Sequence, residues 1–247
     1  MGLLAKVWDW FLTPATWTGS GIDPGILVRT NEHVSMSFQA ILLAAAVALP
    51  VGMYIGHRRR FELMAISVGN IGRALPSFGI LGITFAVTTS LDVPGTLGFW
   101  ATFVALFLLA IPPILTNTYA GIKGVDGDTI EAARGMGMSE REILLKIELP
   151  LAALLIVAGL RLAAVQVVAT ATLGALVAWG GYGRYIVDGF AAGDDVQLLG
   201  GAILVAALAI LTEIAFGLLQ RWMRPKTGSK VATRGEPRDE GALPIAS

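Results

Sequence analysis

The feature that most constrains the fold is a series of long apolar runs, each close to the length that crosses a lipid bilayer. A helix needs about 20 mostly apolar residues to cross. Hydrophobic residues make up 55% of the 247 residues and charged residues only 15%, whereas soluble domains carry about 25% charged residues. The sequence therefore predicts an all-α integral membrane protein with about five transmembrane helices. The expected spans are residues 34–56, 64–89, 97–122, 150–179 and 196–223.

The distribution of lysine and arginine predicts which ends of the spans face the cytoplasm. With five spans and the amino terminus outside, the inner segments hold thirteen of these residues and the outer segments hold three. Cytoplasmic segments of membrane proteins are enriched in Lys and Arg. We therefore expect a multi-pass protein of the cell membrane, in contact with the lipid bilayer, with its carboxyl terminus and residues 123–150 in the cytoplasm.

Residues 123–150 form an island of charge between the third and fourth apolar runs. Ten of the 26 residues from Lys123 to Glu148 are charged. Asp128 stands three residues before Glu131, and Ser139 stands three before Glu142, and both pairs have the spacing of a helix capping box. These pairs predict two short helices, although an ordinary loop with a helical hairpin also fits them.

Glycine and proline punctuate the same island. Gly135 and Gly137 lie between the two predicted helix starts and permit a sharp change of direction. Pro150 is expected to break the second helix or to start the next one, and to hold Leu149 extended.

The island resembles the EAA motif of permease subunits in ATP-binding-cassette (ABC) importers. Seven positions match the family's pattern at its spacing: Glu131, Ala132, Ala133, Gly137, Ile147, Leu149 and Pro150. The resemblance implies the type I importer permease fold and a coupling helix at these residues that docks on an ATPase subunit. It also implies a second permease subunit, the same or homologous, and a solute-binding protein outside the cell. ATP hydrolysis belongs to the separate ATPase, whose closure would turn the pathway outward.

Three ionisable residues lie within the expected spans. Arg73, Arg161 and Glu213 each cost a few kcal/mol at the bilayer centre unless they are paired or face water. For Arg161 and Glu213 we favour a structural pair that fixes helix packing, with a pore lining as the alternative.

Residues in the second and fourth spans are candidates for the translocation pathway. Arg73 precedes Pro76 and Ser77, and a proline-broken backbone at membrane depth usually lines a cavity. Thr170 and Thr172 belong to a run of small residues, which indicates either close helix packing or a pathway wall.

A narrower resemblance concerns the cargo. The run Gly72–Ser77, the Glu32-His33 pair, Ala171-Thr172-Leu173 and the stretch Gly180–Gly183 look like the osmoprotectant permeases, which serve glycine betaine, choline and carnitine. This resemblance covers about residues 30–223. Tyr182 departs from the usual Gly-Gly-Leu-Gly of that group. Methionine and other amino-acid importers share the fold and part of these patches.

Several functional classes lack their residues in this sequence. There is no cysteine and there are only two histidines, which leaves no disulfide, no thiol chemistry and no histidine metal cluster. Neither a phosphate-binding glycine loop nor a hydrolase or metalloprotease motif occurs. We therefore expect no catalytic residues, no cofactor and no metal. The formal net charge is zero, which gives no indication of nucleic-acid binding.

The regions flanking the spans carry weaker signals. Trp8, Trp10 and Trp17 suggest that residues 1–32 lie at the outer membrane surface, where tryptophan is enriched; a disordered leader is the alternative. Residues 33–223 form the expected permease domain. Residues 224–247 form a charged tail with many small residues, which predicts a flexible cytoplasmic segment.

Two other classes of protein remain as alternatives. An ion-coupled secondary transporter would use the charges within the spans, but it predicts internal repeats, which we do not find. A structural membrane subunit without a transport path would leave the arginine beside Pro76 unexplained.

Overall fold

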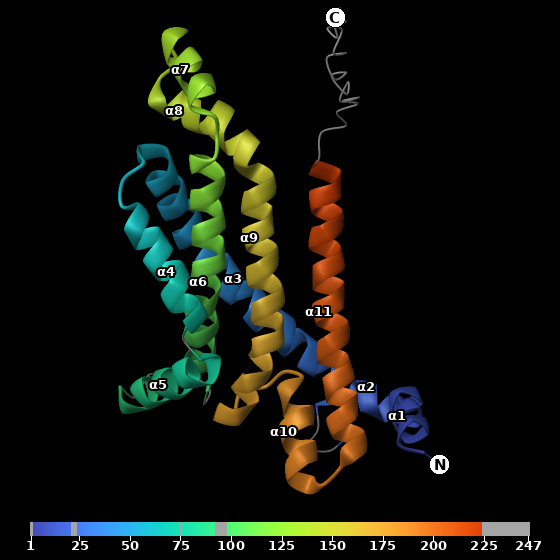
Figure 1. Cartoon of the computed structure of the whole chain (residues 1–247). Helices are drawn as coiled ribbons and strands as arrows, with labels where there is room; N and C mark the ends of the chain where they lie inside the picture. Colours follow the sequence, from blue (N-terminus) through green and yellow to red (C-terminus); the bar gives the residue numbers. More distant parts are fainter. Residues whose placement is uncertain (1, 21–23, 75, 92–97, 224–247) are drawn as a thin grey trace, which may run out of the picture.

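The computed structural model describes residues 2–20, 24–74, 76–91 and 98–223, and all of the elements in these ranges are helices. Figure 1 shows a bundle of long helices with smaller elements at both ends. Four helical segments are long and apolar enough to cross a membrane, or up to five if a bent pair counts as one span. The predicted all-α fold with about five spans is confirmed. The long helices are α3 (Gly25–Arg58), α6 (Phe99–Lys123), α9 (Leu149–Thr170) and α11 (Asp195–Met223).

Small side chains bring α3 and α6 into close contact at the centre of the bundle. Ala40, Ala44 and Ala48 repeat every four residues on α3, and all three are buried. Gly52 continues the row, and a Cβ there would lie only 2.8 Å from the Cβ of Thr118 on α6. Residues of this size let two membrane helices approach until their backbones nearly touch. The three alanines belong to the main hydrophobic core, which also includes Leu106, Ile114, Leu115 and Val167.

The second apolar run forms two helices instead of one straight span. α4 (Glu62–Ala74) packs along α6, while α5 (Ser77–Ser90) turns away at an angle of 94°. Pro76 precedes α5 in an extended conformation, and proline has no N–H with which to continue a helix. The expected interruption at this proline is therefore a sharp bend, and Figure 1 shows α5 lying across the end of the bundle.

The fourth apolar run extends beyond α9 and leads into a further helix. α9 continues as the 3₁₀ helix η2 (Ala171–Val177), and α10 (Gly183–Ala192) lies between the spans expected at residues 150–179 and 196–223. Two glycines allow it to pack closely. A Cβ at Gly189 would lie 2.7 Å from the backbone nitrogen of Leu198, and one at Gly201 would lie 2.6 Å from the Cβ of Tyr185. These two positions let α10 fold back onto α11.

The amino-terminal segment is helical where it is described. α1 (Leu3–Leu12) and α2 (Pro14–Thr18) precede α3, which favours an ordered segment over a disordered leader. The ring of Trp10 sits against Gly200 and stacks edge-on with Tyr185 at 5.5 Å. Residues 25–32 already belong to α3, and the tail from residue 224 lies outside the described residues.

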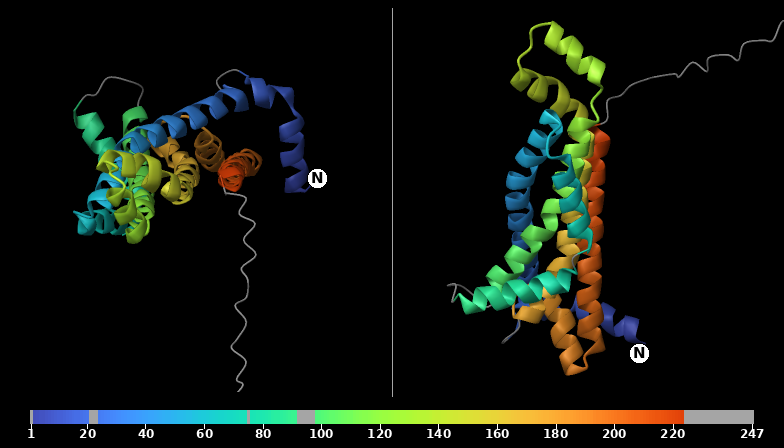
Figure 2. Two further views of the ribbon diagram at one scale, coloured as in Figure 1. Left: turned by 90° about the horizontal axis from the view of Figure 1, so that it is seen from above. Right: turned by 60° about the vertical axis from the view of Figure 1, so that its left-hand side comes forward.

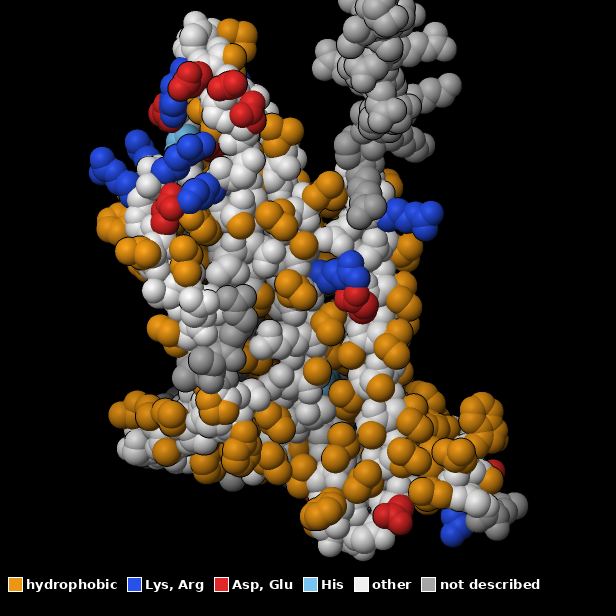
Figure 3. All heavy atoms as spheres, in the orientation of Figure 1, with side chains coloured by type: hydrophobic (Ala, Val, Ile, Leu, Met, Phe, Trp, Pro, Cys, Tyr) orange, Lys and Arg blue, Asp and Glu red, His pale blue; other side chains and the backbone are white. Residues whose placement is uncertain are grey.

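The two ends of the bundle differ in character. α7 (Gly127–Gly135), α8 (Glu140–Ile143) and the π-helix η1 (Leu144–Glu148) lie at one end, with the last residues of α11. α1, α2, α5 and α10 lie at the other end (Figure 1 and the right-hand view of Figure 2). Charged side chains gather around α7 and α8, while apolar side chains cover most of the visible face of the bundle (Figure 3).

Candidate functional site

The loop from α7 to η1 is the most distinctive surface of the molecule, and a glycine sets its shape. Gly137 has a φ of +84°. Its N–H donates to the carbonyl of Arg134 at 2.9 Å, and the N–H of Met138 donates to the carbonyl of Ala133 at 3.2 Å. This pair of bonds is the Schellman ending of a helix, which needs a residue in the left-handed conformation. Gly137 therefore makes the predicted bend, whereas Gly135 is part of α7.

One of the two predicted capping boxes is present. Ser139 caps α8: its hydroxyl accepts from the N–H of Glu142, whose carboxylate accepts from the N–H of Ser139 at 3.1 Å. The box predicted at Asp128 is wrong, because α7 begins one residue before it, at Gly127. Asp126 occupies the cap position without a side-chain bond to the helix. Its carboxylate accepts from the hydroxyl of Thr129 instead, at 3.3 Å.

The loop has a small hydrophobic core of its own. Ala133 and Ile143 are fully buried in it, Val125 and Ile130 are nearly so, and Met138 and Ile147 pack against them. Leu149 packs on a neighbouring cluster that joins α6 to α9. This core holds α7 against α8.

The other predicted motif residues face outward. Glu131, Ala132, Gly137 and Pro150 are exposed, and nothing lies within 4 Å of where a Cβ on Gly137 would be. Met136, beside them, is 76% exposed. The structure therefore brings the motif residues into one loop and divides them into a packed set and a presented set.

The junction between the loop and α9 differs from the prediction. Leu149 is helical, with φ −62° and ψ −47°, so the extended conformation expected before Pro150 is wrong. Pro150 takes a place in the first turn of α9, where a missing N–H is tolerated. The wider π-turn η1 comes immediately before it, and the chain stays helical throughout. Single π-turns within helices occur frequently at functional sites.

Ion pairs fix the exposed side of the loop. Arg134 donates to both oxygens of Glu140, at 2.7 and 3.1 Å. Lys146 donates to Glu142 at 2.8 Å, and this ammonium group, with the N–H and hydroxyl of Ser139, lowers the pKa of Glu142 to about 2. The carboxylate therefore stays ionised at any physiological pH.

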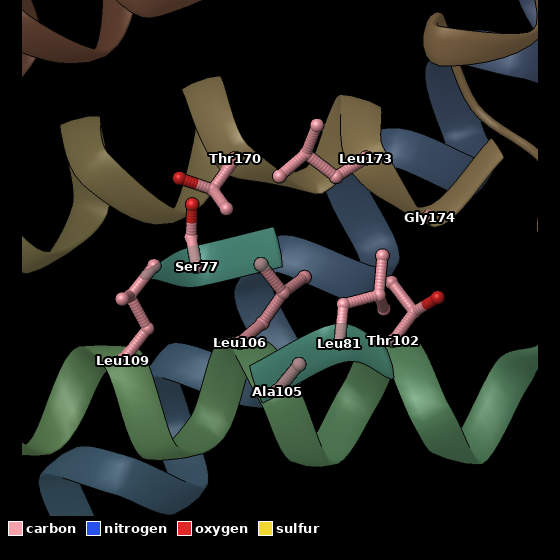
Figure 4. Close-up of a pocket in the computed structure, with 9 residues that line it drawn as sticks. All are labelled: Ser77, Leu81, Thr102, Ala105, Leu106, Leu109, Thr170, Leu173 and Gly174. Atoms are coloured by element: carbon pink, nitrogen blue, oxygen red, sulfur yellow. The ribbon is translucent and has the colours of Figure 1, made fainter. Parts of the chain in front are cut away.

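Two of the predicted pathway residues meet in a small pocket. Ser77 on α5 and Thr170 at the end of α9 line it and point toward one another (Figure 4). Its volume of about 10 Å³ has room for about one water molecule. Thr102, fully buried on α6, also borders the pocket, and its hydroxyl has no hydrogen-bond partner among the described residues.

The remaining pathway candidates lie elsewhere. The hydroxyl of Thr172 donates to the carbonyl of Ala169 at 2.8 Å and does not line this pocket. Pro76 is exposed ahead of α5. Arg73 belongs to α4, but its side chain lies outside the described residues.

A larger groove of about 450 Å³ runs between α4, α6 and α9, and the sequence reasoning did not identify it. Asn117 and Gln166 supply polar groups to its wall, and Gly69 and Gly72 line its α4 side. The side-chain amide of Asn117 also donates to the carbonyl oxygen of Pro113, four residues earlier in α6, at 2.8 Å. The sequence feature that could have indicated this groove is Asn117, a polar residue within an apolar run and four positions after Pro113.

Arg161 and Glu213 are in contact, which ties α9 to α11. The Nε of Arg161 donates to Oε2 of Glu213 at 2.7 Å, and a second contact joins NH2 to Oε1. NH1 of the same guanidinium donates to the side chain of Gln220 at 2.7 Å. The two side chains are 32% and 44% exposed in the isolated chain, so the pair lies on the surface of the bundle, with Glu213 at the edge of the groove.

The patches that carried the narrower resemblance also meet. Glu32 accepts from the N–H of Gly181 at 2.7 Å. His33 accepts from the N–H of Tyr182 at 3.2 Å, stacks on its ring, and bonds the carbonyl of Val168 at 2.9 Å. The start of α3 therefore holds the glycine-rich turn before α10.

Comparison with known proteins gives consistent results. Residues 48–228 match the family described as "Binding-protein-dependent transport system inner membrane component". A carnitine transport permease protein (OpuCB) of Listeria monocytogenes is 37% identical over 211 residues, covering 85% of this chain and 94% of that protein. A choline transport system permease protein (OpuBB) of Bacillus subtilis is 34% identical over 200 residues, covering 81% and 89%.

Solved structures share the fold. The chain superimposes on an inward-facing conformation of the MetNI methionine ABC transporter with a TM-score of 0.71 and 23% identity, covering 81% of this chain and 97% of that one. An amino acid ABC transporter crystallised with histidines gives a TM-score of 0.64 at 16% identity. The family match spans most of the chain and includes the whole α7–η1 loop, so the protein belongs to the inner membrane components of binding-protein-dependent transport systems.

Proposed function

We propose that the chain is the permease subunit of an ATP-driven importer of quaternary ammonium osmoprotectants such as glycine betaine, carnitine and choline. The observation that carries the proposal is the outward-facing loop at one end of the bundle, in a chain of this family. The cargo class is supported by the relatives named for carnitine and choline transport. The likeness to a methionine transporter, at 23% identity, concerns the fold alone.

The docking surface for an ATPase subunit is formed by those members of the presented set that lie on α7 and in the turn after it, Glu131, Ala132 and Gly137, with Met136 beside them. All four are exposed, and the core beneath them transmits a push to η1 and α9. This surface lies at the end of the bundle where the charged side chains gather (Figure 3). That placement supports a cytoplasmic loop and carboxyl terminus, with α1 and the amino terminus outside.

The translocation path follows the groove between α4, α6 and α9. Its openness and its polar side chains, Asn117 and Gln166, suit a small zwitterion or cation that must be passed on and not retained. Ser77 and Thr170 border the same region at the bend between α4 and α5. A second permease subunit would close the groove, a solute-binding protein would deliver cargo at the α10 end, and residues 33–223 would form the permease domain.

The test is transport in proteoliposomes that contain the permease, its ATPase and its binding protein. Gly137→Asp places a charged side chain on the docking surface, and Glu131→Lys reverses a charge there. We expect both variants to insert normally and to lose most uptake. ATP hydrolysis should no longer depend on the presence of substrate.

The matched control is Asp9→Lys, which makes the same charge change as Glu131→Lys at an exposed position of α1, at the opposite end of the bundle. We expect it to leave uptake unchanged. Wild-type uptake in both Gly137→Asp and Glu131→Lys would contradict the docking surface. Uptake that follows an ion gradient without ATP would indicate a secondary transporter, and competition by methionine instead of glycine betaine would contradict the cargo class.

A further inference from the structure

A histidine at the end of α3 reaches across to the loop. The Nδ1 of His57 lies 2.6 Å from Oε2 of Glu148, the last residue of η1. Its Nε2 lies 3.2 Å from Oε2 of Glu140 on α8. The ring is therefore held between two carboxylates that come from different elements, 91 and 83 residues further along the chain.

The contact with Glu148 fixes which ring nitrogen carries a hydrogen. An ionised carboxylate only accepts hydrogen bonds, so Nδ1, which lies 2.6 Å from Oε2 of Glu148, is the donor. The contact of Nε2 with Glu140 is a longer approach to a second carboxylate. The side chains of His57 and Glu148 are 8% and 3% exposed. Among the described residues, His57 is the only hydrogen-bond partner of the Glu148 carboxylate.

The charges that face this pair are of both signs. A polar pocket of about 240 Å³ lies beside the ring. Arg58 and Arg59 line it from the end of α3, and Glu131 and Arg134 line it from α7. Arg134 forms an ion pair with Glu140, which adds a third contact to this series. The contacts run from Arg134 on α7 to Glu140 on α8, then to His57 on α3 and to Glu148 on η1.

We propose that His57 is the positioning residue that couples movement of the docking loop to α3. The inference rests on the proposed function, because it concerns how docking at α7 reaches the membrane helices. α3 forms the centre of the core with α6, so a link from η1 to its end carries a displacement of the loop into the bundle. Without the ring, the buried carboxylate of Glu148 has no hydrogen-bond donor among the described residues, and the link opens.

Histidine spectroscopy tests the contact with Glu148 without any transport assay. The chain has only two histidines, His33 and His57, so protein labelled with ¹⁵N-histidine gives two sets of ring signals. The set that disappears in His57→Gln belongs to His57. We expect its Nδ1 to carry a hydrogen that is bonded to the carboxylate, and Glu148→Gln to shift that signal while the signals of His33 stay in place. A His57 signal that does not change in Glu148→Gln would overturn the inference.

Transport tests the coupling. In proteoliposomes, we expect His57→Gln to raise the ATP hydrolysed per substrate moved several-fold. The double variant His57→Gln/Glu148→Gln replaces the pair by two amides that can bond each other. It should recover a low ratio, which a loss of packing alone would not allow.

The control is Arg60→Gln, which removes a cation three residues away at an exposed position with no partner among the described residues. It should keep the wild-type ratio. If Gly137→Asp uncouples transport but His57→Gln keeps the wild-type ratio, the inference fails and the proposed function stands. If Gly137→Asp has no effect either, the docking surface itself is wrong.

Discussion

Replacing Gly52 by alanine adds one methyl group at the closest approach of α3 and α6. The new Cβ would lie 2.8 Å from the Cβ of Thr118 and 3.0 Å from the carbonyl oxygen of Leu115. Ordinary contacts of this kind are about 3.5–4.0 Å. Neither neighbour is the far end of a flexible side chain, so the strain cannot be relieved by a change of rotamer. The two helices must separate by several tenths of an ångström along the main core.

The magnitude follows from two opposing terms. Alanine in a helix interior is favoured over glycine by about 1 kcal/mol, while overpacking a core costs about 1–3 kcal/mol. Gly82 on α5 supplies the matched control, because nothing lies within 4 Å of the Cβ that Gly82→Ala would add. The helix term is common to both variants, so the difference between Gly52→Ala and Gly82→Ala isolates the overpacking term.

Thermal unfolding in detergent measures the difference. For a chain of about this length, 1 kcal/mol shifts Tm by about 2–4 °C, so Gly52→Ala should unfold about 2–12 °C below Gly82→Ala. Equal Tm values for the two variants, or a higher value for Gly52→Ala, would refute the close contact of α3 with α6.

Three further predictions concern single features of the structure. Ser139→Ala removes the cap of α8 and should cost about 1 kcal/mol locally, seen as faster hydrogen exchange over residues 139–148 with no change over α3. Arg161→Gln and Glu213→Gln should each lower Tm, and the double variant should lower it by less than the sum; strictly additive shifts would mean that the pair contributes nothing. Because the chain has no cysteine, Ser77→Cys offers a single labelling site. Its rate of reaction with a water-soluble thiol reagent should change when ATP is added, whereas a cysteine that never reacts in an active protein would place α5 away from the path.

Apolar run length predicted the positions of the spans because lipid imposes a minimum helix length that the sequence must satisfy locally. The spans expected at residues 97–122 and 196–223 differ from α6 and α11 by only one or two residues. The 94° bend at Pro76 was not predictable in the same way. A proline indicates that the helix is interrupted, but the angle between α4 and α5 depends on where α5 packs against the rest of the bundle.

Local motifs succeeded where a single arrangement was possible and failed where two competed. Ser139 is the only cap candidate next to α8, and it forms the predicted box. Asp126 and Asp128 are both suitable caps for α7, and spacing alone favoured the wrong one. The contact between His57 and Glu148 joins residues 91 positions apart, and no local pattern in the sequence connects them.

The motif in the loop combines two physical requirements that a sequence pattern records as one. Ala133 has no exposed surface and touches the core of the loop, so any larger side chain would push α7 away from Ile143. Ala132 and Gly137 are exposed and have no such neighbour, so a larger side chain there costs the isolated chain little beyond the left-handed strain at Gly137. A requirement for small residues at these two positions must then come from a surface that approaches them. The isolated permease with Ala132→Leu should therefore have the thermal stability of the wild type, and its defect should appear as lost transport in the complex with the ATPase. Ala133→Leu should already lower the thermal stability of the isolated permease.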